Sequence, residues 1–361
     1  MRDKVAILTL LNDNFQVHKR NFVLRLQVFK QRVEKFWPCQ RELPKPLKAG
    51  SKSGKSDGGG DEMRPLKLGE LTSFFARHFA LFIEMYRGRL APSPTGLLHA
   101  GHARTFWTAQ QRAESAGGIL VLRNEDLDAE RSRKEFAAAM VEDLCWFGFR
   151  WREGPDCGGP YRPYAQSGRY VFYRAALEKL RAAGWIYPCR CSRRDVLRAL
   201  RAPHAEEEEP VYPGTCRPKP GATFASQNST PANWRFRVPD GKAICFEDGF
   251  FGSQQFQAGK DFGDFVVWRH DDAPSYQLAV VVDDAAMKIT EVVRGVDLLL
   301  STARQLLLYR ALELEPPAFY HCPLLTDEAG ARLAKRHDAL SLRSLRENGK
   351  TPQMVRESWQ A

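Results

Sequence analysis

Residues 89–102 constrain the fold of this chain more than any other segment, because their composition suits a strand that turns directly into a helix. The segment reads RLAPSPTGLLHAGH. His99 and His102 are three residues apart, so both lie on one face of the first helical turn, and Gly101 between them lets a flat ligand approach the backbone. A helix N-terminus presents free N–H groups and a partial positive charge, which favour phosphate. The pattern predicts a cradle for a nucleotide triphosphate.

Segments typical of strands and helices alternate around this cradle. We expect strands over residues 87–91 and 119–123, and helices over residues 99–117 and 170–183. The second strand is almost wholly apolar, as a buried parallel strand should be. Ser132 is the expected cap of a further helix. The alternation predicts an α/β fold with a doubly wound parallel sheet of the Rossmann type, whose ligand binds at the carboxyl ends of the strands.

Residues 185–260 interrupt this alternation. Strand-like runs at 234–238 and 242–247 flank Pro239–Gly241, a composition typical of a hairpin turn. We therefore expect a subdomain inserted between two halves of the sheet. The expected domains are residues 1–84 as an extension of unknown role with a linker at 50–62, residues 85–184 as the first half of the doubly wound domain, residues 185–260 as the insertion, and residues 261–361 as the second half.

The expected insertion contains a candidate metal site. Cys189 and Cys191 are separated by one residue, and Cys216 follows in a Tyr-Pro-Gly-Thr-Cys run. Three thiols with one further ligand would complete a tetrahedral, structural zinc site. His204 and Tyr212 compete for the fourth position on spacing alone. Ordinary buried cysteines are the alternative interpretation.

Charge and composition restrict the protein class only loosely. The formal net charge of the 361 residues is +11, and seven of these excess positive charges lie in residues 1–84. The basicity gives modest support for nucleic-acid binding by the remainder. No apolar run reaches the ~20 residues that a membrane span needs. Eight scattered cysteines fit a reducing cytoplasm.

Residues 1–84 do not resemble the rest of the chain. Residues 50–62 read GSKSGKSDGGGDE, a flexible linker by composition. The run Gly54–Ser56 ends like a phosphate-binding loop, but Ala49 stands where that motif needs glycine. An organelle transit peptide and a true translation start at Met85 are the other two interpretations that remain open.

Five blocks in order resemble the catalytic core of class I aminoacyl-tRNA synthetases, in the glutamate-specific branch. These blocks are residues 89–102, 118–128, 275–284, 290–295 and 332–336. The last block departs from the family's Lys-x-Ser-Lys loop at Arg332 and Ala334, while Lys335 is retained. The resemblance implies a HUP-type Rossmann-like catalytic domain with an inserted zinc-containing subdomain, and it favours Tyr212 as the fourth zinc ligand.

The resemblance also implies a chemistry and a set of roles. ATP, with Mg²⁺, would convert L-glutamate to glutamyl-adenylate. The implied catalytic residues are His99, His102 and Lys335, and the implied ATP-binding residues are these three with Gly101. The implied glutamate-binding residues are Arg89, Leu90, Ala91, Pro92, Ser93, Glu125, Tyr276 and Arg294. Two structural alternatives are an ion pair of Glu125 with Arg123 and a sheet-edge ion pair of Arg294.

The end of the chain bears on the substrate. Only 26 residues follow Lys335, too few for an anticodon-binding domain of typical size. The chain thus resembles a shortened family, the glutamyl-Q tRNA(Asp) synthetases, and Val280 also fits that family. This resemblance implies a monomer that transfers glutamate to queuosine at the wobble position of tRNA(Asp). A truncated glutamyl-tRNA synthetase and a non-catalytic module that binds RNA or an amino acid are the alternatives.

Overall fold

The computed structural model describes residues 85–192, 211–219, 232–325 and 341–359. All of them belong to the second of two compact units into which the chain divides, Ser73–Ala361. The expected linker at 50–62, and also His204 and Lys335, lie outside the described residues.

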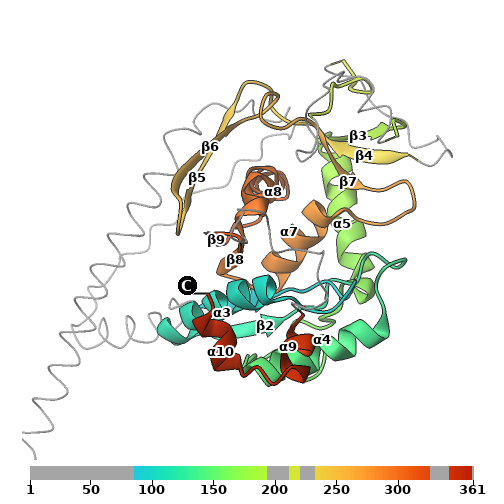
Figure 1. The fold of residues 1–361 in the computed structure, drawn as a ribbon. Coiled ribbons are helices and arrows are strands. Elements are labelled where there is room, and N and C mark those ends of the chain that lie inside the picture. The colour runs from blue at the N-terminus through green and yellow to red at the C-terminus, as the bar shows by residue number, and fades with distance from the viewer. Residues whose placement is uncertain (1–84, 193–210, 220–231, 326–340, 360–361) are drawn as a thin grey trace, which may run out of the picture. The chain divides into compact units, whose positions relative to one another are not determined.

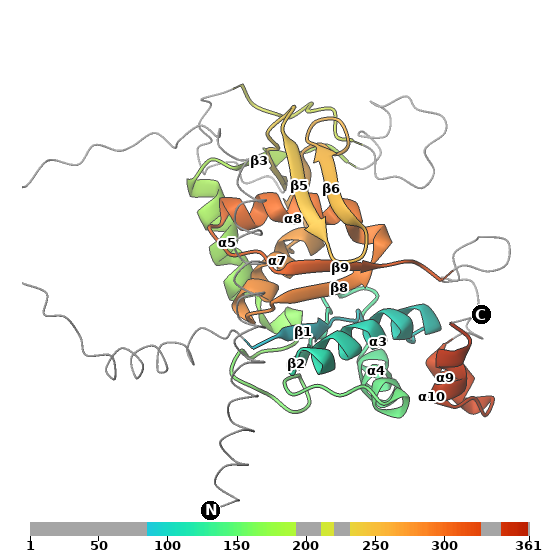
Figure 2. The same ribbon diagram turned by 90° about the vertical axis from the view of Figure 1, so that its left-hand side faces the viewer.

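Two groups of strands form the sheet framework behind the cradle (Figures 1 and 2). The first group is β1 (Arg87–Leu90) and β2 (Ile119–Leu122), which pair in parallel. The second group has the order β6 (Gly252–Gln257), β5 (Ala243–Asp248), β9 (Ala318–Cys322) and β8 (Glu291–Gly295), and β8 and β9 are parallel. The Thr290 backbone N–H donates to the Arg87 carbonyl oxygen at 2.9 Å, so β1 lies beside the start of β8.

Helices in the described ranges alternate with these strands, which confirms an α/β fold with parallel strands. They are α3 (Ala100–Ser115), α4 (Lys134–Phe147), α5 (Tyr170–Ala182), α7 (Tyr276–Ala286), α8 (Leu299–Ala311), α9 (Leu342–Glu347) and α10 (Pro352–Glu357). Helices α3 and α5 begin and end within two residues of their expected bounds. The expected cap at Ser132 is wrong, because α4 begins at Lys134 after an N-cap Arg133 that makes no side-chain capping bond.

A separate three-stranded sheet has the order β3 (Ile186–Cys189), β4 (Asn233–Phe236) and β7 (Phe265–Trp268), with antiparallel neighbours. The hairpin expected between residues 234–238 and 242–247 is therefore wrong. A turn does form, since the Lys242 N–H donates to the Pro239 carbonyl oxygen. However, β4 is already paired on both sides, and β5 instead pairs with β6 and meets β9 at Asp248 and Phe319.

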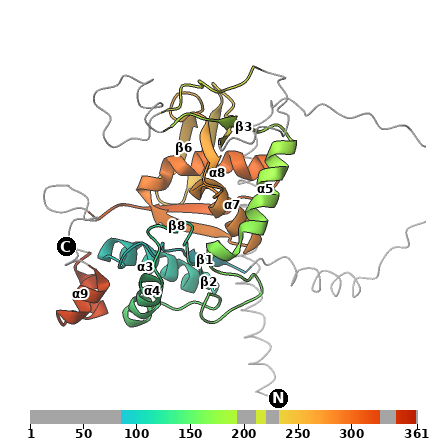
Figure 3. The ribbon, with the colours of Figure 1, turned by 90° about the vertical axis from the view of Figure 1, so that its right-hand side faces the viewer.

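Two large apolar cores flank the framework. One core lies between α5, α7 and α8, to which these helices contribute Tyr173, Leu278 and Leu308, respectively. The other packs α3 and α4, and Leu342 of α9 joins it; α9 lies beside α4 (Figure 3). The Trp359 ring, which follows α10, stacks on Phe147 with ring centroids 5.7 Å apart. Among the described residues, we find no helix with the length and apolar character that crossing a membrane would require.

Candidate active site

A buried cluster of charges lies where β2 ends, beside the C-terminal part of α7. The side chain of Arg123, which follows β2, is fully buried. Its guanidinium lies 2.6 Å from an oxygen of Asp284 in α7 and 2.9 Å from an oxygen of Glu125. Burial opposes its charge, but the carboxylates of Asp284 and Glu125 raise its pKa well above the usual value. Arg123 therefore remains a cation that joins β2 to α7.

Glu125 forms the ion pair with Arg123 that the structural alternative described. Its side chain is 9% exposed, and burial raises the pKa of its carboxyl group despite the neighbouring arginines. The Glu125 backbone N–H donates to the Pro92 carbonyl oxygen at 3.0 Å. This bond brings the carboxylate beside the loop that follows β1, so an ion pair and a ligand contact are both open to the same side chain.

Arg89 lies on β1 beside this cluster. Its Nη1 donates to the Val293 carbonyl oxygen at 2.8 Å, and its Nε lies 3.6 Å from Asp284. The Nε atom is buried and has no hydrogen-bond partner in the structure. Arg89 thus connects β1 to β8, the strand that carries Arg294, and retains donor capacity.

Arg294 on β8 is a buried cation with neutral partners. It is 4% exposed. Its guanidinium donates to four neutral acceptors: His321 Nε2 at 3.1 Å, Gln305 Oε1 at 2.9 Å, Thr302 Oγ1 at 2.7 Å and the Tyr276 hydroxyl at 3.4 Å. Burial lowers the pKa of Arg294, while Tyr276 opposes that shift. No carboxylate in the described ranges forms an ion pair with Arg294, so the alternative of a sheet-edge ion pair does not hold, and the surroundings of Arg294 favour an anionic ligand.

Tyr276 is the first residue of α7 and is 37% exposed. The N-cap Ser275 accepts a hydrogen bond from the Leu278 N–H, which sets the start of the helix. Tyr276 is therefore partly exposed, and its hydroxyl contacts Arg294. Arg89, Glu125, Tyr276 and Arg294 are brought together through this network.

The N-terminus of α3 carries the two histidines. His99 is the N-cap residue, and its backbone N–H donates to His102 Nδ1 at 3.4 Å. A Cβ placed on Gly101 would meet no described atom within 4 Å, so the backbone there faces open space. Leu342 N–H donates to the Leu98 carbonyl oxygen at 2.7 Å. The described chain that follows residue 340 therefore returns to this helix start.

The remaining expected site residues differ in their surroundings. Leu90 is fully buried in the core, and Pro92 is also buried. Ser93 is exposed, and Ala91 is intermediate. Leu90 therefore contributes packing with its side chain, and a ligand can meet this segment only through its backbone or through the exposed positions.

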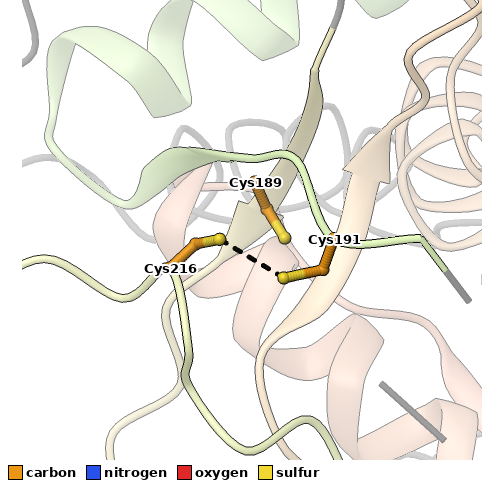
Figure 4. Close-up of side chains that lie close together, drawn as sticks. All are labelled: Cys189, Cys191 and Cys216. Carbon is orange, nitrogen blue, oxygen red and sulfur yellow. Dashed lines mark hydrogen bonds between the residues drawn. The ribbon is translucent and has the colours of Figure 1, made fainter. Parts of the chain in front are cut away.

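The expected thiol site comes together in the separate three-stranded sheet and the loop near it. The sulfur atoms of Cys189, Cys191 and Cys216 all lie within 4.8 Å of one another, and Figure 4 shows the three side chains converging. The Tyr212 hydroxyl lies 3.4 Å from the Cys189 sulfur and 3.7 Å from the Cys191 sulfur. Three thiols in this arrangement are of the kind that binds zinc, whereas burial and the neighbouring thiols raise the pKa of Tyr212, which opposes a phenolate as the fourth ligand.

Electrostatics favour a thiolate at Cys216, whereas burial raises the pKa of Cys191 to about 11. Burial would raise the pKa of Cys216, but hydrogen bonds from Tyr212, the backbone and the neighbouring thiols lower it to about 7. Arg235 Nε donates to the Cys189 sulfur at 3.2 Å, and its guanidinium lies over the Tyr212 ring. Thiolates are the form that binds metal.

Comparison with known proteins gives the class. Residues 85–359 match the family model "tRNA synthetases class I (E and Q), catalytic domain". A glutamate-tRNA synthetase structure from Elizabethkingia anophelis aligns with a TM-score of 0.62 and 31% identity, over 74% of this chain and 54% of that one. The chain belongs to the class I tRNA synthetases of the glutamate and glutamine group.

Curated relatives narrow the class further. A glutamyl-Q tRNA(Asp) synthetase of Symbiobacterium thermophilum is 50% identical over 75% of this chain and 84% of its own length. One of Nitratidesulfovibrio vulgaris is 48% identical over 73% and 82%, respectively. A glutamate–tRNA ligase of Sulfurihydrogenibium is 41% identical, and the chain covers about half of it, 55%. The chain is a member of the glutamyl-Q tRNA(Asp) synthetase family, which makes it a ligase-type enzyme.

Some site residues were not identified from sequence. Asp248 and His321 lie 73 positions apart, in no motif, yet their side chains meet behind Arg294. Asp284 falls within a recognised block, but nothing in that block marked it as the partner of Arg123. Predicting that β5 pairs with β9 would have brought Asp248 and His321 together. The wrong hairpin prediction paired β5 with residues 234–238 instead.

Proposed function

We propose that this protein activates L-glutamate with ATP in the absence of tRNA and then transfers the glutamate to queuosine in the anticodon of tRNA(Asp). The observation that carries the first step is Arg294, a buried cation whose described acceptors are all neutral and which lies in one network with Arg89 and Glu125. Such a site attracts an anion, and the nearby acid suits an ammonium group.

In the proposed binding mode, the side-chain carboxylate of glutamate faces Arg294, Tyr276 and Arg89. The α-ammonium group faces Glu125. Four of the five N–H groups of Arg294 donate to the acceptors described above, so the carboxylate takes the remaining N–H of Nη2, and the charge of the guanidinium gives selectivity for glutamate over its neutral amide. Ser93 and the backbone of Ala91 supply polar contacts beside this arrangement.

The α-carboxylate then attacks the α-phosphorus of ATP, and pyrophosphate leaves. Because the carboxylate is already a nucleophile, the protein has to orient two anions and stabilise the charge that develops on the phosphates. His99 and His102 at the start of α3 are suited to that role, and the open face of Gly101 admits the nucleotide. Mg²⁺ would neutralise phosphate charge when bound. We assign Lys335 to the pyrophosphate, supported by Ser341, which bridges to His99 in the described chain.

The three cysteines and Tyr212 would hold one structural zinc ion. All four positions would then be filled by protein ligands, which leaves none for a reacting water. We propose that the expected insertion at 185–260 carries this site, although its β5 and β6 join β9 in the framework sheet and β7, beyond residue 260, completes the small sheet.

The choice of tRNA rests on the relatives. The chain covers 84% and 82% of two glutamyl-Q tRNA(Asp) synthetases at about 50% identity, and it covers 55% of a glutamate–tRNA ligase at lower identity. In the second step, a hydroxyl of the queuosine cyclopentenediol attacks the adenylate carbonyl. An ester forms and AMP leaves.

Two assays test this proposal. Glutamate-dependent exchange of pyrophosphate into ATP without tRNA tests activation, and its absence would favour a non-catalytic binding module. Transfer of labelled glutamate is then compared on tRNA(Asp) with queuosine, tRNA(Asp) without queuosine, and tRNA(Glu). We expect label only on the first. Charging of tRNA(Glu) alone would identify a glutamyl-tRNA synthetase instead.

A further inference from the structure

Asp248, the last residue of β5, has a side chain that accepts hydrogen bonds from three backbone N–H groups and contacts a histidine ring. It is 5% exposed. Its Oδ1 accepts the backbone N–H groups of Phe250 and Phe251 at 3.0 and 2.9 Å, and its Oδ2 accepts the His321 N–H at 3.1 Å. Burial would raise the pKa of this carboxyl group, but bonds from His321 and the two backbone groups lower it. Asp248 is therefore a fixed, buried anion.

His321 on β9 lies between this anion and Arg294. Its Nδ1 lies 2.6 Å from Asp248 Oδ2, and a carboxylate can only accept, so Nδ1 carries the proton. Its Nε2 accepts from Arg294 Nε at 3.1 Å. Burial lowers the pKa of His321, which keeps the ring neutral. Asp248 therefore fixes the tautomer of His321, and this tautomer leaves Nε2 free to accept from Arg294.

Thr302 on α8 completes the arrangement. Its hydroxyl accepts from Arg294 Nη2 at 2.7 Å and lies 3.3 Å from His321 Nε2. The hydroxyl can therefore donate to the same ring nitrogen. The hydrogen bonds that link Asp248, His321 and Arg294 can both form only when the ring proton of His321 is on Nδ1.

We propose that Asp248 and His321 are positioning residues for glutamate recognition, which fix the orientation of the Arg294 guanidinium through a neutral imidazole and form no ion pair with it. The inference depends on the proposed role of Arg294. In this proposal, the side of the Arg294 guanidinium near Tyr276 faces the substrate only while His321 accepts the hydrogen bond from Arg294 Nε.

The substitution Asp248→Asn tests the proton position with little change in volume. An amide can donate to Nδ1, which moves the ring proton to Nε2 and sets two N–H groups against each other at Arg294. A carboxylate-to-amide change that alters the tautomer is known to disable a histidine without moving it. We expect the KM for glutamate to rise about tenfold or more, with the KM for ATP nearly unchanged and kcat changed less. The preference for glutamate over glutamine should fall in parallel.

His321→Gln is the second variant, because its amide oxygen can still accept from Arg294 Nε. We expect a smaller rise in the KM for glutamate than in Asp248→Asn. Asp143→Asn is the matched control, since Asp143 is a buried acid of α4 that bonds Arg343 outside the site. It should leave the KM for glutamate at the wild-type value. Thermal unfolding of each variant verifies that the protein folds.

The double variant separates positioning from general support. If Asp248 acts through Arg294, then Asp248→Asn should add almost nothing to Arg294→Ala, whereas independent effects would add. A normal KM for glutamate in Asp248→Asn, with a raised KM in Arg294→Ala, overturns the positioning role alone. An unchanged KM in Arg294→Ala overturns the proposed role of Arg294 itself.

Discussion

Arg294 is a buried arginine whose guanidinium is hydrogen-bonded and still keeps a net charge that can attract an anionic ligand. Buried arginines usually pair with carboxylates, because an uncompensated charge is expensive to desolvate. Here the described acceptors are an imidazole, an amide and two hydroxyls. These groups satisfy the donor geometry without cancelling the charge. The attraction for an anion is therefore retained at a place where a direct ion pair would have removed it.

Arg294→Ala should raise the KM for glutamate by about two orders of magnitude, since a hydrogen bond between two charged groups contributes up to about 3 kcal/mol. The KM for ATP should change little. Steady-state pyrophosphate exchange measures both values. Arg294→Lys keeps the charge and loses the fork, so we expect an intermediate KM. An equal loss of affinity for both substrates would contradict the assignment.

The residue scale also shows what sequence could and could not predict. Arg89, Glu125, Tyr276 and Arg294 stand in recognisable blocks, and the structure brings them together. The support behind Arg294 was not predicted, because an Asp–His contact between strands depends on which strands pair. Alternation along the chain predicts that a segment is a strand, but it does not identify the neighbour.

Among the elements, α5 and α7 are joined by one buried carboxylate. Asp283 of α7 is fully buried, accepts from Arg169 Nε at 2.6 Å and lies 2.9 Å from the Tyr173 hydroxyl. Helix α7 also carries Tyr276 and Asp284. The packing of these two helices therefore sets the position of one wall of the site.

Asp283→Asn should lower the free energy of unfolding by about 3–5 kcal/mol, because it leaves the buried guanidinium of Arg169 without its anion. Asp272→Asn is the matched control, since Asp272 pairs with Arg174 of α5 at the surface. Its cost should stay below about 1 kcal/mol. Urea denaturation of both variants measures the difference, and equal effects would show that burial of the pair does not matter.

The small sheet of β3, β4 and β7 leads to a prediction about metal. Purified protein should contain one zinc ion per chain, and Cys216→Ser should lose it and unfold at a lower temperature. Cys145→Ser is the control, because Cys145 is an exposed thiol outside the cluster. Metal analysis and thermal unfolding measure both variants. Full stability of Cys216→Ser without zinc would argue against a structural site.

Element boundaries were easier to predict than element partners. Glycines with positive φ follow α3 and α5, at Gly117 and Gly184, and they mark those helix ends in sequence. Pro239–Gly241 correctly predicts a turn, but a turn does not require the flanking strands to pair with each other. Here β4 found its partners in β3 and β7, which lie beyond the range of any local signal.

At the scale of the whole molecule, stability should depend on pH through His321. Burial lowers its pKa from the usual 6.5, with bonds to Asp248 opposing that shift. Below about pH 6.5 the unfolded chain therefore binds a proton that the folded protein does not, so stability falls as the pH falls. Above that pH, the contribution is complete.

Denaturation of the wild type between pH 7.5 and 5.5 should show this loss. His321→Gln should have a flatter dependence over the same range, whatever its absolute stability. The exposed His270→Gln should keep the wild-type slope. An identical slope in His321→Gln would mean that other groups account for the acid sensitivity.

The bond between Thr290 and Arg87, with that between Arg89 and Val293, has a consequence for how the protein is made. These partners are about 200 residues apart in sequence. A ribosome adds roughly 5–20 residues per second, so the first strands leave the exit tunnel on the order of ten seconds or more before their neighbour exists. Until then the nascent chain holds Arg89 and Arg123 without Val293, and no fragment that stops short of β8 contains all the residues of the proposed glutamate site.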